Sequence, residues 1–256
     1  MKKYIVGNWK MNLNVHESSL FAAKLAQVLP IRRDVEAVIC PSFLSLQPIS
    51  LQISHRQMKL GAQNCYWRDE GAFTGEISAA QLRGLAQYVI IGHSERRYIF
   101  SEDDRDIRFK VQAALRNCIR PILCVGETEM ERSDGDAEHV LCDQVASGLM
   151  NVSSEELDQV LIAYEPVWAV GSTKPATNEE IAEAAKVIRT QIEHMFGKSA
   201  ASTVPILYGG SSNLENGKEI LSIKGIDGLL LGRSSLIAPE FAGLVNAAAE
   251  VSRENK

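Results

Sequence analysis

Eight short apolar runs, spread along the whole chain, constrain the fold of this sequence more than any other feature. Each is four to six residues long, most are rich in Val, Ile and Leu, and they do not alternate with polar residues. Strands that are buried on both faces have this composition, as in a parallel sheet covered by helices. The predicted strands are Tyr4–Gly7, Val35–Cys40, Lys59–Ala62, Tyr88–Gly92, Pro121–Gly126, Val160–Tyr164, Pro205–Gly209 and Gly228–Gly232.

Segments with helical spacing lie between these runs. Apolar residues recur at helical intervals from Phe21 to Leu29, from Ile107 to Leu115 and from Ile181 to Met195. A serine or threonine followed three residues later by a glutamate has the spacing of a capping box, in which side chains satisfy free backbone N–H groups. This spacing begins at Ser153 and at Thr177, and it predicts a helix start at each.

The number of runs, set against the chain length, favours a barrel. Eight units of the 256-residue chain average about 32 residues, the size of a repeated strand–helix unit. We therefore predict an α/β protein in which residues 1–256 form a single (β/α)8 barrel domain. The alternative is an open, doubly wound sheet. Its dinucleotide-binding form needs a G-x-G-x-x-G sequence after the first strand, which Gly7–Lys10 does not supply.

Charge and cysteine content narrow the functional classes. Lysine and arginine number 27 against 32 aspartates and glutamates, and the net charge of −5 argues against broad nucleic-acid binding. We expect no secretory signal and no membrane association, because neither an apolar signal core nor a run long enough to span a bilayer occurs. Five cysteines without a C-x-x-C pair predict reduced thiols in a cytoplasmic protein, not disulfides or a zinc site.

Side chains suited to catalysis gather just after the predicted strands. Asn8 and Lys10 follow the first strand, His93 and Glu95 follow the fourth, and Glu165 follows the sixth. The carboxyl ends of all strands in a (β/α)8 barrel open on one face, where the active sites of such barrels are built. We therefore expect these five residues to lie close together in space.

Glu165 and His93 are the candidate catalytic pair. Glu165 stands in the apolar segment 161–170, where an ionised carboxylate is costly unless it is paired. It is either a general base or a strand-end carboxylate in an ion pair. His93 is either a hydrogen-bonded core residue or a neutral imidazole that donates a hydrogen bond to a carbonyl oxygen, because a nearby helix N-terminus disfavours its cationic form.

Lys10, Asn8 and Glu95 form the second candidate group. Lys10 is either a surface lysine, the common case, or a partly enclosed residue that contacts substrate. Asn8 beside it is a weaker candidate, because asparagine is common in turns. We expect Glu95 to hold Lys10, and Arg96 and Arg97 to make structural ion pairs.

Three glycine-containing segments predict a phosphate site, although each alone would suit an ordinary turn. Loops after the seventh and eighth strands commonly hold phosphate in these barrels, through backbone N–H groups. The segments are Gly171-Ser172, Gly209-Gly210-Ser211 and Gly232-Arg233. The segment 166–176, which has prolines near both ends, predicts either a lid that excludes water or a rigid loop.

These residues together resemble the triosephosphate isomerase family over nearly the full chain. The combination of motifs, all in register, is very specific. The matching segments are Gly7–Asn12, Gly61–Asn64, Gly71–Glu76, Gly92–Arg97, Ala163–Ala169 and Tyr208–Ser211. The resemblance implies a TIM barrel that interconverts dihydroxyacetone phosphate and D-glyceraldehyde 3-phosphate in glycolysis and gluconeogenesis, with no metal or organic cofactor.

The resemblance also implies a role for each candidate residue. Glu165 would move a proton between adjacent carbons through an enediolate, and neutral His93 would polarise the oxygens. Lys10 and Asn8 would stabilise the developing negative charge. The triose phosphate would rest on backbone N–H groups of Gly171, Ser211, Gly232 and Arg233. The family further implies a homodimer in which the third loop, with Thr74 at its tip, docks beside the partner's active site.

Two departures from the family pattern affect the lid and the phosphate site. The lid tip reads Gly171-Ser172-Thr173 where the family usually has Gly-Thr-Gly, and Pro175 stiffens the second hinge. We expect the lid kinetics to differ while the chemistry is retained. Arg233 stands where the family usually has a second glycine, so its side chain must point away from the phosphate or add a charged contact.

The same fold would also serve two alternative functions. An isomerase of a related four-carbon ketose phosphate needs the same base and electrophile, and only pocket size distinguishes it. A non-catalytic sugar-phosphate sensor on this fold would have lost some of Asn8, Lys10, His93 and Glu165, and all four are present.

Overall fold

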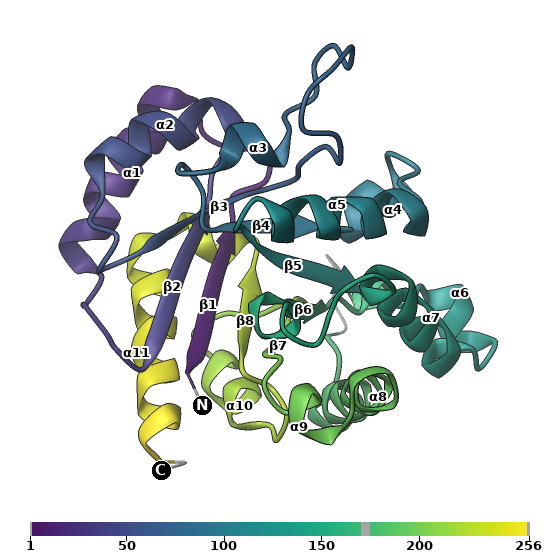
Figure 1. The fold of residues 1–256 in the computed structure, drawn as a ribbon. Helices are drawn as coiled ribbons and strands as arrows, with labels where there is room; N and C mark the ends of the chain where they lie inside the picture. The colour runs from purple at the N-terminus through teal and green to yellow at the C-terminus, as the bar shows by residue number, and fades with distance from the viewer. Residues whose placement is uncertain (1, 170–174, 255–256) are drawn as a thin grey trace.

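Eight parallel strands close into a barrel in the computed structural model, which describes residues 2–169 and 175–254 (Figure 1). Each strand pairs with the next along the chain, and the last pairs with the first. The predicted (β/α)8 TIM barrel is confirmed, and the alternative of an open sheet is wrong. The strands are β1 Lys3–Asn8, β2 Val35–Cys40, β3 Lys59–Ala62, β4 Tyr88–Ile91, β5 Arg120–Val125, β6 Leu161–Tyr164, β7 Ile206–Tyr208 and β8 Gly228–Leu231.

Helices surround the barrel, and the segment between β3 and α3 extends away from it (Figure 1). The three predicted apolar stripes lie on α1, α5 and α8, with Leu29 just past the end of α1. The α-helices are α1 Val15–Val28, α2 Phe43–Gln52, α3 Ala79–Leu82, α4 Ser94–Tyr98, α5 Asp104–Arg116, α6 Glu129–Ser133, α7 Ala137–Leu149, α8 Asn178–Phe196, α9 Lys198–Ala201, α10 Gly217–Ser222 and α11 Ala238–Glu254. The 3₁₀ helices are η1 Leu157–Gln159, η2 Val167–Ala169 and η3 Arg233–Leu236.

The two predicted capping boxes have different outcomes. Thr177 caps α8 as predicted, with both hydrogen bonds of the box formed to Glu180. The box at Ser153 forms its two hydrogen bonds with Glu156, but the α-helix predicted there is wrong. A turn and the short helix η1 follow instead, because β6 begins at Leu161 and leaves no room for a longer helix.

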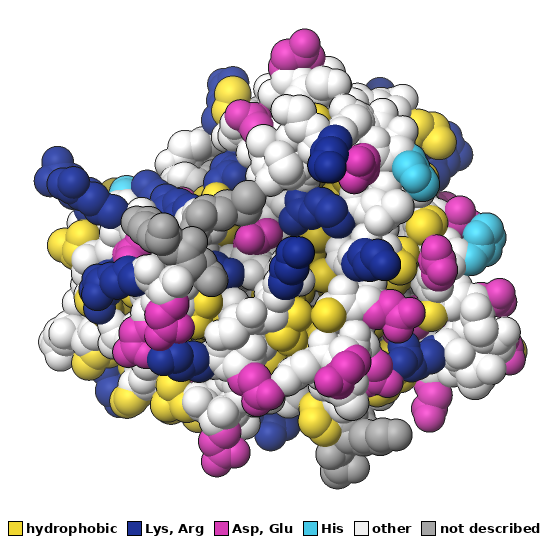
Figure 2. Space-filling model, turned by 90° about the horizontal axis from the view of Figure 1, so that it is seen from below, with side chains coloured by type: hydrophobic (Ala, Val, Ile, Leu, Met, Phe, Trp, Pro, Cys, Tyr) yellow, Lys and Arg dark blue, Asp and Glu magenta, His cyan; other side chains and the backbone are white. Residues whose placement is uncertain are grey.

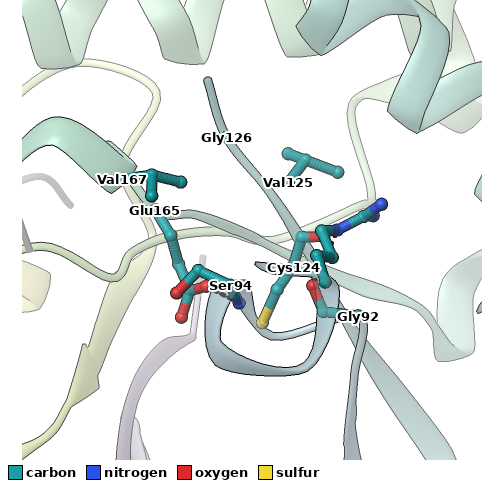
Figure 3. Close-up of a pocket in the computed structure, with 8 residues that line it drawn as sticks. Gly92, Ser94, Cys124, Val125, Gly126, Glu165 and Val167 are labelled. Carbon is teal, nitrogen blue, oxygen red and sulfur yellow. Dashed lines mark hydrogen bonds between the residues drawn. The ribbon is translucent and has the colours of Figure 1, made fainter. Parts of the chain in front are cut away.

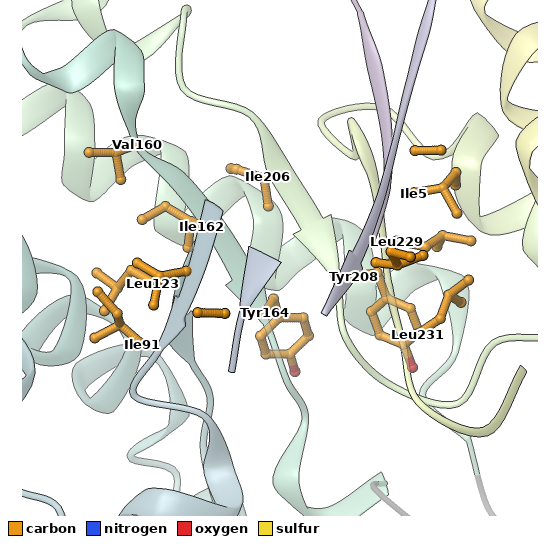
Figure 4. Packing of buried hydrophobic residues seen from close by; sticks show 14 of the residues in the cluster. Ile5, Ile91, Leu123, Val160, Ile162, Tyr164, Ile206, Tyr208, Leu229 and Leu231 are labelled. Carbon is orange, nitrogen blue, oxygen red and sulfur yellow. The ribbon is translucent and has the colours of Figure 1, made fainter. Parts of the chain in front are cut away.

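Side chains of the strands alternate between two cores. One core consists only of strand residues and fills the barrel interior. The other core, part of which Figure 4 shows, lies between the strands and the helices around them. On β6, Leu161 and Ala163 belong to the interior core, and Ile162 and Tyr164 to the outer one. Glu165 follows Tyr164 directly, so the alternation directs its side chain toward the barrel axis.

Within residues 2–169 and 175–254, no helix is both long enough and apolar enough to cross a membrane.

Candidate active site

Three of the candidate residues are buried at the carboxyl ends of strands. Asn8 ends β1, His93 lies between β4 and α4, and Glu165 follows β6. Their exposed fractions are 5%, 6% and 3%, so water screens their interactions only weakly. Barrel closure therefore brings together three polar groups that are far apart in the sequence.

The carboxylate of Glu165 is held at both oxygens. Oε2 accepts a hydrogen bond from the backbone N–H of Ser94 at 2.8 Å, and Oε1 lies 3.0 Å from Nε2 of His93. Figure 3 shows this carboxylate directed toward Ser94, in a pocket that Cys124 also lines. The alternative interpretation of Glu165, a strand-end carboxylate in an ion pair, requires a protonated His93 as the partner in this contact.

Two glycines allow Glu165 its position. A side chain at Gly126 would place a Cβ atom 1.8 Å from the carbonyl oxygen of Glu165, which backbone cannot tolerate. A Cβ atom at Gly209 would lie 2.8 Å from Cγ of Glu165. Both positions therefore require glycine because of close approach to the candidate base.

The hydrogen bonds of His93 define which ring nitrogen carries the proton. His93 caps α4, and its Nδ1 accepts the backbone N–H of Glu95 at 3.2 Å. An accepting Nδ1 has no proton, so the neutral imidazole carries its proton on Nε2 and donates it toward Glu165. This tautomer is the one that suits a hydrogen-bond donor to a substrate oxygen.

Lys10 is fixed by three neighbours. Its Nζ donates to Oε1 of Glu95 at 2.7 Å, its backbone N–H donates to Oδ1 of Asn8 at 3.0 Å, and its carbonyl accepts from Gln63 at 2.8 Å. The contact between Glu95 and Lys10 is thus the one expected from the sequence. One chain of contacts runs from Asn8 through Lys10, Glu95 and His93 to Glu165.

The candidate phosphate residues lie in part beside Lys10. A Cβ atom at Gly232 would be 3.6 Å from Cε of Lys10, so this glycine lies next to the ammonium group. Arg233, the first residue of η3, and Ser211 are exposed. Gly171, and with it residues 170–174 of the predicted lid, falls outside the described residues.

A hydrogen bond from Ser234 joins the loops after β7 and β8. The hydroxyl of Ser234 donates to the carbonyl oxygen of Ser212 at 2.7 Å, and that of Ser235 donates to the carbonyl oxygen of Gly232 at 2.6 Å. The first bond holds the two candidate phosphate loops together, and the second lies within the loop after β8.

Arg96 and Arg97 form ion pairs next to the site. Arg96 pairs with Glu102 at 2.6 Å and Arg97 with Asp104 at 2.6 Å. Arg97 also donates to the carbonyl oxygen of Cys124 at 3.1 Å. Both arginines therefore act in the framework around the site, as expected from the sequence.

Several groups that contribute to the candidate active site were not predicted from the sequence. Ser94 acts through its backbone N–H, which no residue pattern reveals. Burial, together with the charge of Glu165, raises the pKa of the Cys124 thiol well above its usual range. Gln63 donates to both Lys10 and Cys40. Gln63 could have been predicted from the sequence, because it follows β3 directly and the other candidates were chosen as polar residues that follow a strand.

Comparison with known proteins identifies the family. The family model described as "Triosephosphate isomerase" matches residues 3–248. Proteins named triosephosphate isomerase from Dehalococcoides mccartyi and Natranaerobius thermophilus are 42% and 44% identical, over 98% and 95% of both chains. The crystal structure of triosephosphate isomerase from Bartonella henselae has a TM-score of 0.87 and 36% identity, covering 96% of this chain and 99% of that one. The chain belongs to the triosephosphate isomerase family.

Proposed function

We propose that this enzyme interconverts dihydroxyacetone phosphate and D-glyceraldehyde 3-phosphate with Glu165 as base and His93 as electrophile. The observation that carries the assignment is the 3.0 Å contact between Oε1 of Glu165 and Nε2 of His93, with Nδ1 of His93 already accepting from Glu95. A carboxylate base and a neutral donor at this distance can act on a carbon and on the oxygen attached to it.

The proton transfer starts with a rearrangement of Glu165. Both of its oxygens have partners, so the carboxylate leaves Ser94 and His93 when substrate enters. It then removes a proton from the carbon beside the carbonyl and returns it to the adjacent carbon. His93 donates its Nε2 proton to the carbonyl oxygen as that oxygen gains negative charge and takes back the proton of the neighbouring hydroxyl, so that one proton moves between the oxygens while Glu165 moves one between the carbons. The ammonium of Lys10 stabilises the enediolate, supported by Asn8.

The phosphate is proposed to bind to backbone N–H groups of Gly171, Ser211, Gly232 and Arg233. The place of Gly232 beside Lys10 supports this, because the ammonium then lies near both the phosphate and the reacting oxygens. The face drawn in Figure 2, which is the underside of the view in Figure 1, carries acidic and basic side chains interspersed, and the chain as a whole is acidic. Local groups, not the net charge of −5, therefore hold the anion.

Substitution of Glu165 tests the assignment. We expect Glu165→Gln to lower kcat by about 10³-fold with a small change in KM, since general-base catalysis contributes about 10²–10⁴-fold. Glu193→Gln, on the exposed surface of α8, is the matched control. A coupled assay on glyceraldehyde 3-phosphate, run in parallel with a four-carbon ketose phosphate, measures both activity and specificity. Full activity of Glu165→Gln would remove Glu165 as the base.

We also propose a homodimer formed through the segment between β3 and α3. Thr74 lies exposed in this segment. Large apolar side chains are also exposed elsewhere: Met11 after β1 at 99%, and Ile99 and Phe100 after α4 at 70% and 65%. Such exposure supports an interface. We expect Thr74→Arg to halve the mass measured by sedimentation and to lower kcat, whereas Thr203→Arg should change neither. A dimeric Thr74→Arg variant with full activity would exclude this interface.

A single domain over residues 1–256 and a cytoplasmic location complete the proposal. Five cysteines that all remain free thiols support the location, because disulfides form in oxidising compartments.

A further inference from the structure

A polar side chain, that of Gln144, interrupts the apolar face that α7 packs against the barrel. The buried residues of this helix are Leu141, Gln144, Val145, Gly148 and Leu149. Gln144 is 7% exposed. A buried amide costs free energy unless it is hydrogen-bonded, so Gln144 needs partners that an apolar side chain at this position would not need.

Two hydrogen bonds tie Gln144 to the backbone of one residue, Gly126, which directly follows β5. Oε1 of Gln144 accepts from the N–H of Gly126 at 2.8 Å, and Nε2 of Gln144 donates to the carbonyl oxygen of Gly126 at 3.3 Å. Both backbone groups of Gly126 are therefore paired with the same side-chain amide, as they would be with the backbone of a neighbouring strand.

The ends of the strands explain why Gly126 needs a side chain as its partner. On one side of β5, the carbonyl oxygen of Val125 accepts from the N–H of Glu165 at 2.8 Å. Successive residues of a strand direct their backbone groups to opposite sides, so those of Gly126 face away from β6. On that side the pairing of β4 with β5 has already ended, at Ile91. Gln144 therefore takes the place that a longer β4 would fill.

Gly126 in turn lies against the backbone of the proposed base. A Cβ atom at Gly126 would be 1.8 Å from the carbonyl oxygen of Glu165, so the Cα atom of Gly126 packs directly against Glu165. Both residues line the same pocket (Figure 3), whereas Gln144 is not among the described residues that line it. Gln144 therefore reaches Glu165 through Gly126.

We propose that Gln144 is a positioning residue of the isomerase reaction, which fixes Gly126 and, through it, the backbone of Glu165. The carboxylate of Glu165 has to leave Ser94 and His93 when substrate enters, and its own backbone is the pivot of that movement. A fixed pivot brings the carboxylate to the reacting carbon in one geometry, and a misplacement of about 1 Å costs up to about 10²-fold in rate. The role rests on the proposed function, because it requires Glu165 to be the base.

Kinetics of two variants on glyceraldehyde 3-phosphate test this role. Gln144→Met keeps the length of the side chain but removes both hydrogen bonds. Gln144→Asn keeps the amide but is one methylene group shorter, and it disturbs packing less, so the test does not depend on the folding of Gln144→Met alone. We expect each variant to lower kcat about 10-fold, with KM and the inhibition constant of inorganic phosphate nearly unchanged, since the phosphate is proposed to bind to other loops.

Gln57→Met is the matched control. Nε2 of Gln57 also donates to a backbone carbonyl oxygen, that of Ala26, at 2.8 Å. Gln57 precedes β3, so it lies at the amino ends of the strands, on the face of the barrel opposite to the candidate active site. Its substitution should lower thermal stability and leave kcat unchanged, because a lost hydrogen bond that acts only on the fold does not move the base.

The outcomes separate this role from the proposed function. A kcat within about twofold of the unaltered chain in the Gln144 variants that fold would overturn the role. Equal losses of kcat in Gln57→Met and in these variants would also overturn it. In either case a low kcat of Glu165→Gln would still support Glu165 as the base. Full activity of Glu165→Gln would overturn the proposed function and the role of Gln144 together.

Discussion

The backbone of Lys10 has the left-handed conformation, with φ of 53°. A residue with a side chain adopts this conformation at a cost of about 1–2 kcal/mol, so other contacts must hold it. Gln63 donates one side-chain nitrogen to the carbonyl oxygens of Lys10 and Cys40, at 2.8 and 2.9 Å. The orientation of the Lys10 ammonium therefore depends on a residue that does not reach the proposed reacting atoms.

We expect Gln63→Leu to lower kcat/KM about 10-fold, a loss of about 1.4 kcal/mol of transition-state stabilisation. The loss should appear in both kcat and KM, because Lys10 is proposed to contact the phosphate and the reacting oxygens. Gln87→Leu is the control: Gln87 accepts from Leu60 N–H and takes no part in the site. It should lower stability but leave the kinetic constants near normal. Equal kinetic effects of the two substitutions would show that Gln63 acts only through stability.

The five thiols should differ sharply in reactivity. Burial raises the pKa of Cys65 to about 12 and also raises those of Cys40 and Cys124, so all three are protonated and enclosed. Cys118 is exposed and Cys142 is half-buried. We expect an aromatic disulfide reagent to modify Cys118 first and Cys142 more slowly, and the other three only after unfolding. Loss of the fast phase in Cys118→Ser verifies the order, whereas rapid modification of five thiols in the native protein contradicts it.

Among secondary-structure elements, the strands were the most predictable from sequence. Val35–Cys40 and Lys59–Ala62 were predicted with the observed bounds, because a strand buried on both faces must be apolar throughout. The capping box at Ser153 misled the prediction for a physical reason. Its side-chain hydrogen bonds satisfy only the first turn, and the neighbouring strand determines how far a helix can continue.

The two capping boxes allow a matched stability test. Thr177→Ala removes the cap of the 19-residue helix α8 and should lower the free energy of unfolding by about 1 kcal/mol. Ser153→Ala removes the same kind of hydrogen bond from a turn that leads only into η1, and should cost less than about half as much. Urea denaturation of both variants measures the difference. Equal losses of unfolding free energy in the two variants would mean that a capping box stabilises only its own turn, whatever helix follows it.

At the scale of the whole molecule, barrel closure decides which parts of the site the sequence could reveal. Polar residues after the strands were visible as exceptions to an apolar pattern, so Asn8, His93 and Glu165 could be selected. The contact of Ser94 N–H with Glu165 and the need for glycine at position 209 arise between different strand–helix units, and only the closed barrel brings these units together. The sequence therefore predicted side chains of the proposed site, but not the backbone groups that contact them.

The opposite end of the barrel is closed by a charged cluster whose state depends on pH. Oε1 of Glu36 accepts from the hydroxyl of Tyr88 at 2.7 Å, Tyr88 in turn accepts from Arg120 at 2.8 Å, and Lys2 pairs with the same carboxylate. Burial alone would raise the pKa of Glu36. The hydrogen bonds from Lys2 and Tyr88, with the charges of Lys2 and Lys59, outweigh burial and lower this pKa below its ordinary value of 4.5.

This shift makes acid stability depend on Glu36. The pKa is lower in the folded chain than in the unfolded one, so the carboxylate contributes stability above pH 4.5, and the contribution is lost as pH falls through the folded pKa. Glu36→Gln should therefore be less stable at pH 7 and should lose less further stability below pH 4.5 than the unaltered chain. Urea midpoints measured across this range test the expectation, with the exposed Glu155→Gln as control. Parallel curves for Glu36→Gln and the unaltered chain would show that Glu36 has the same affinity for protons in the folded and unfolded states.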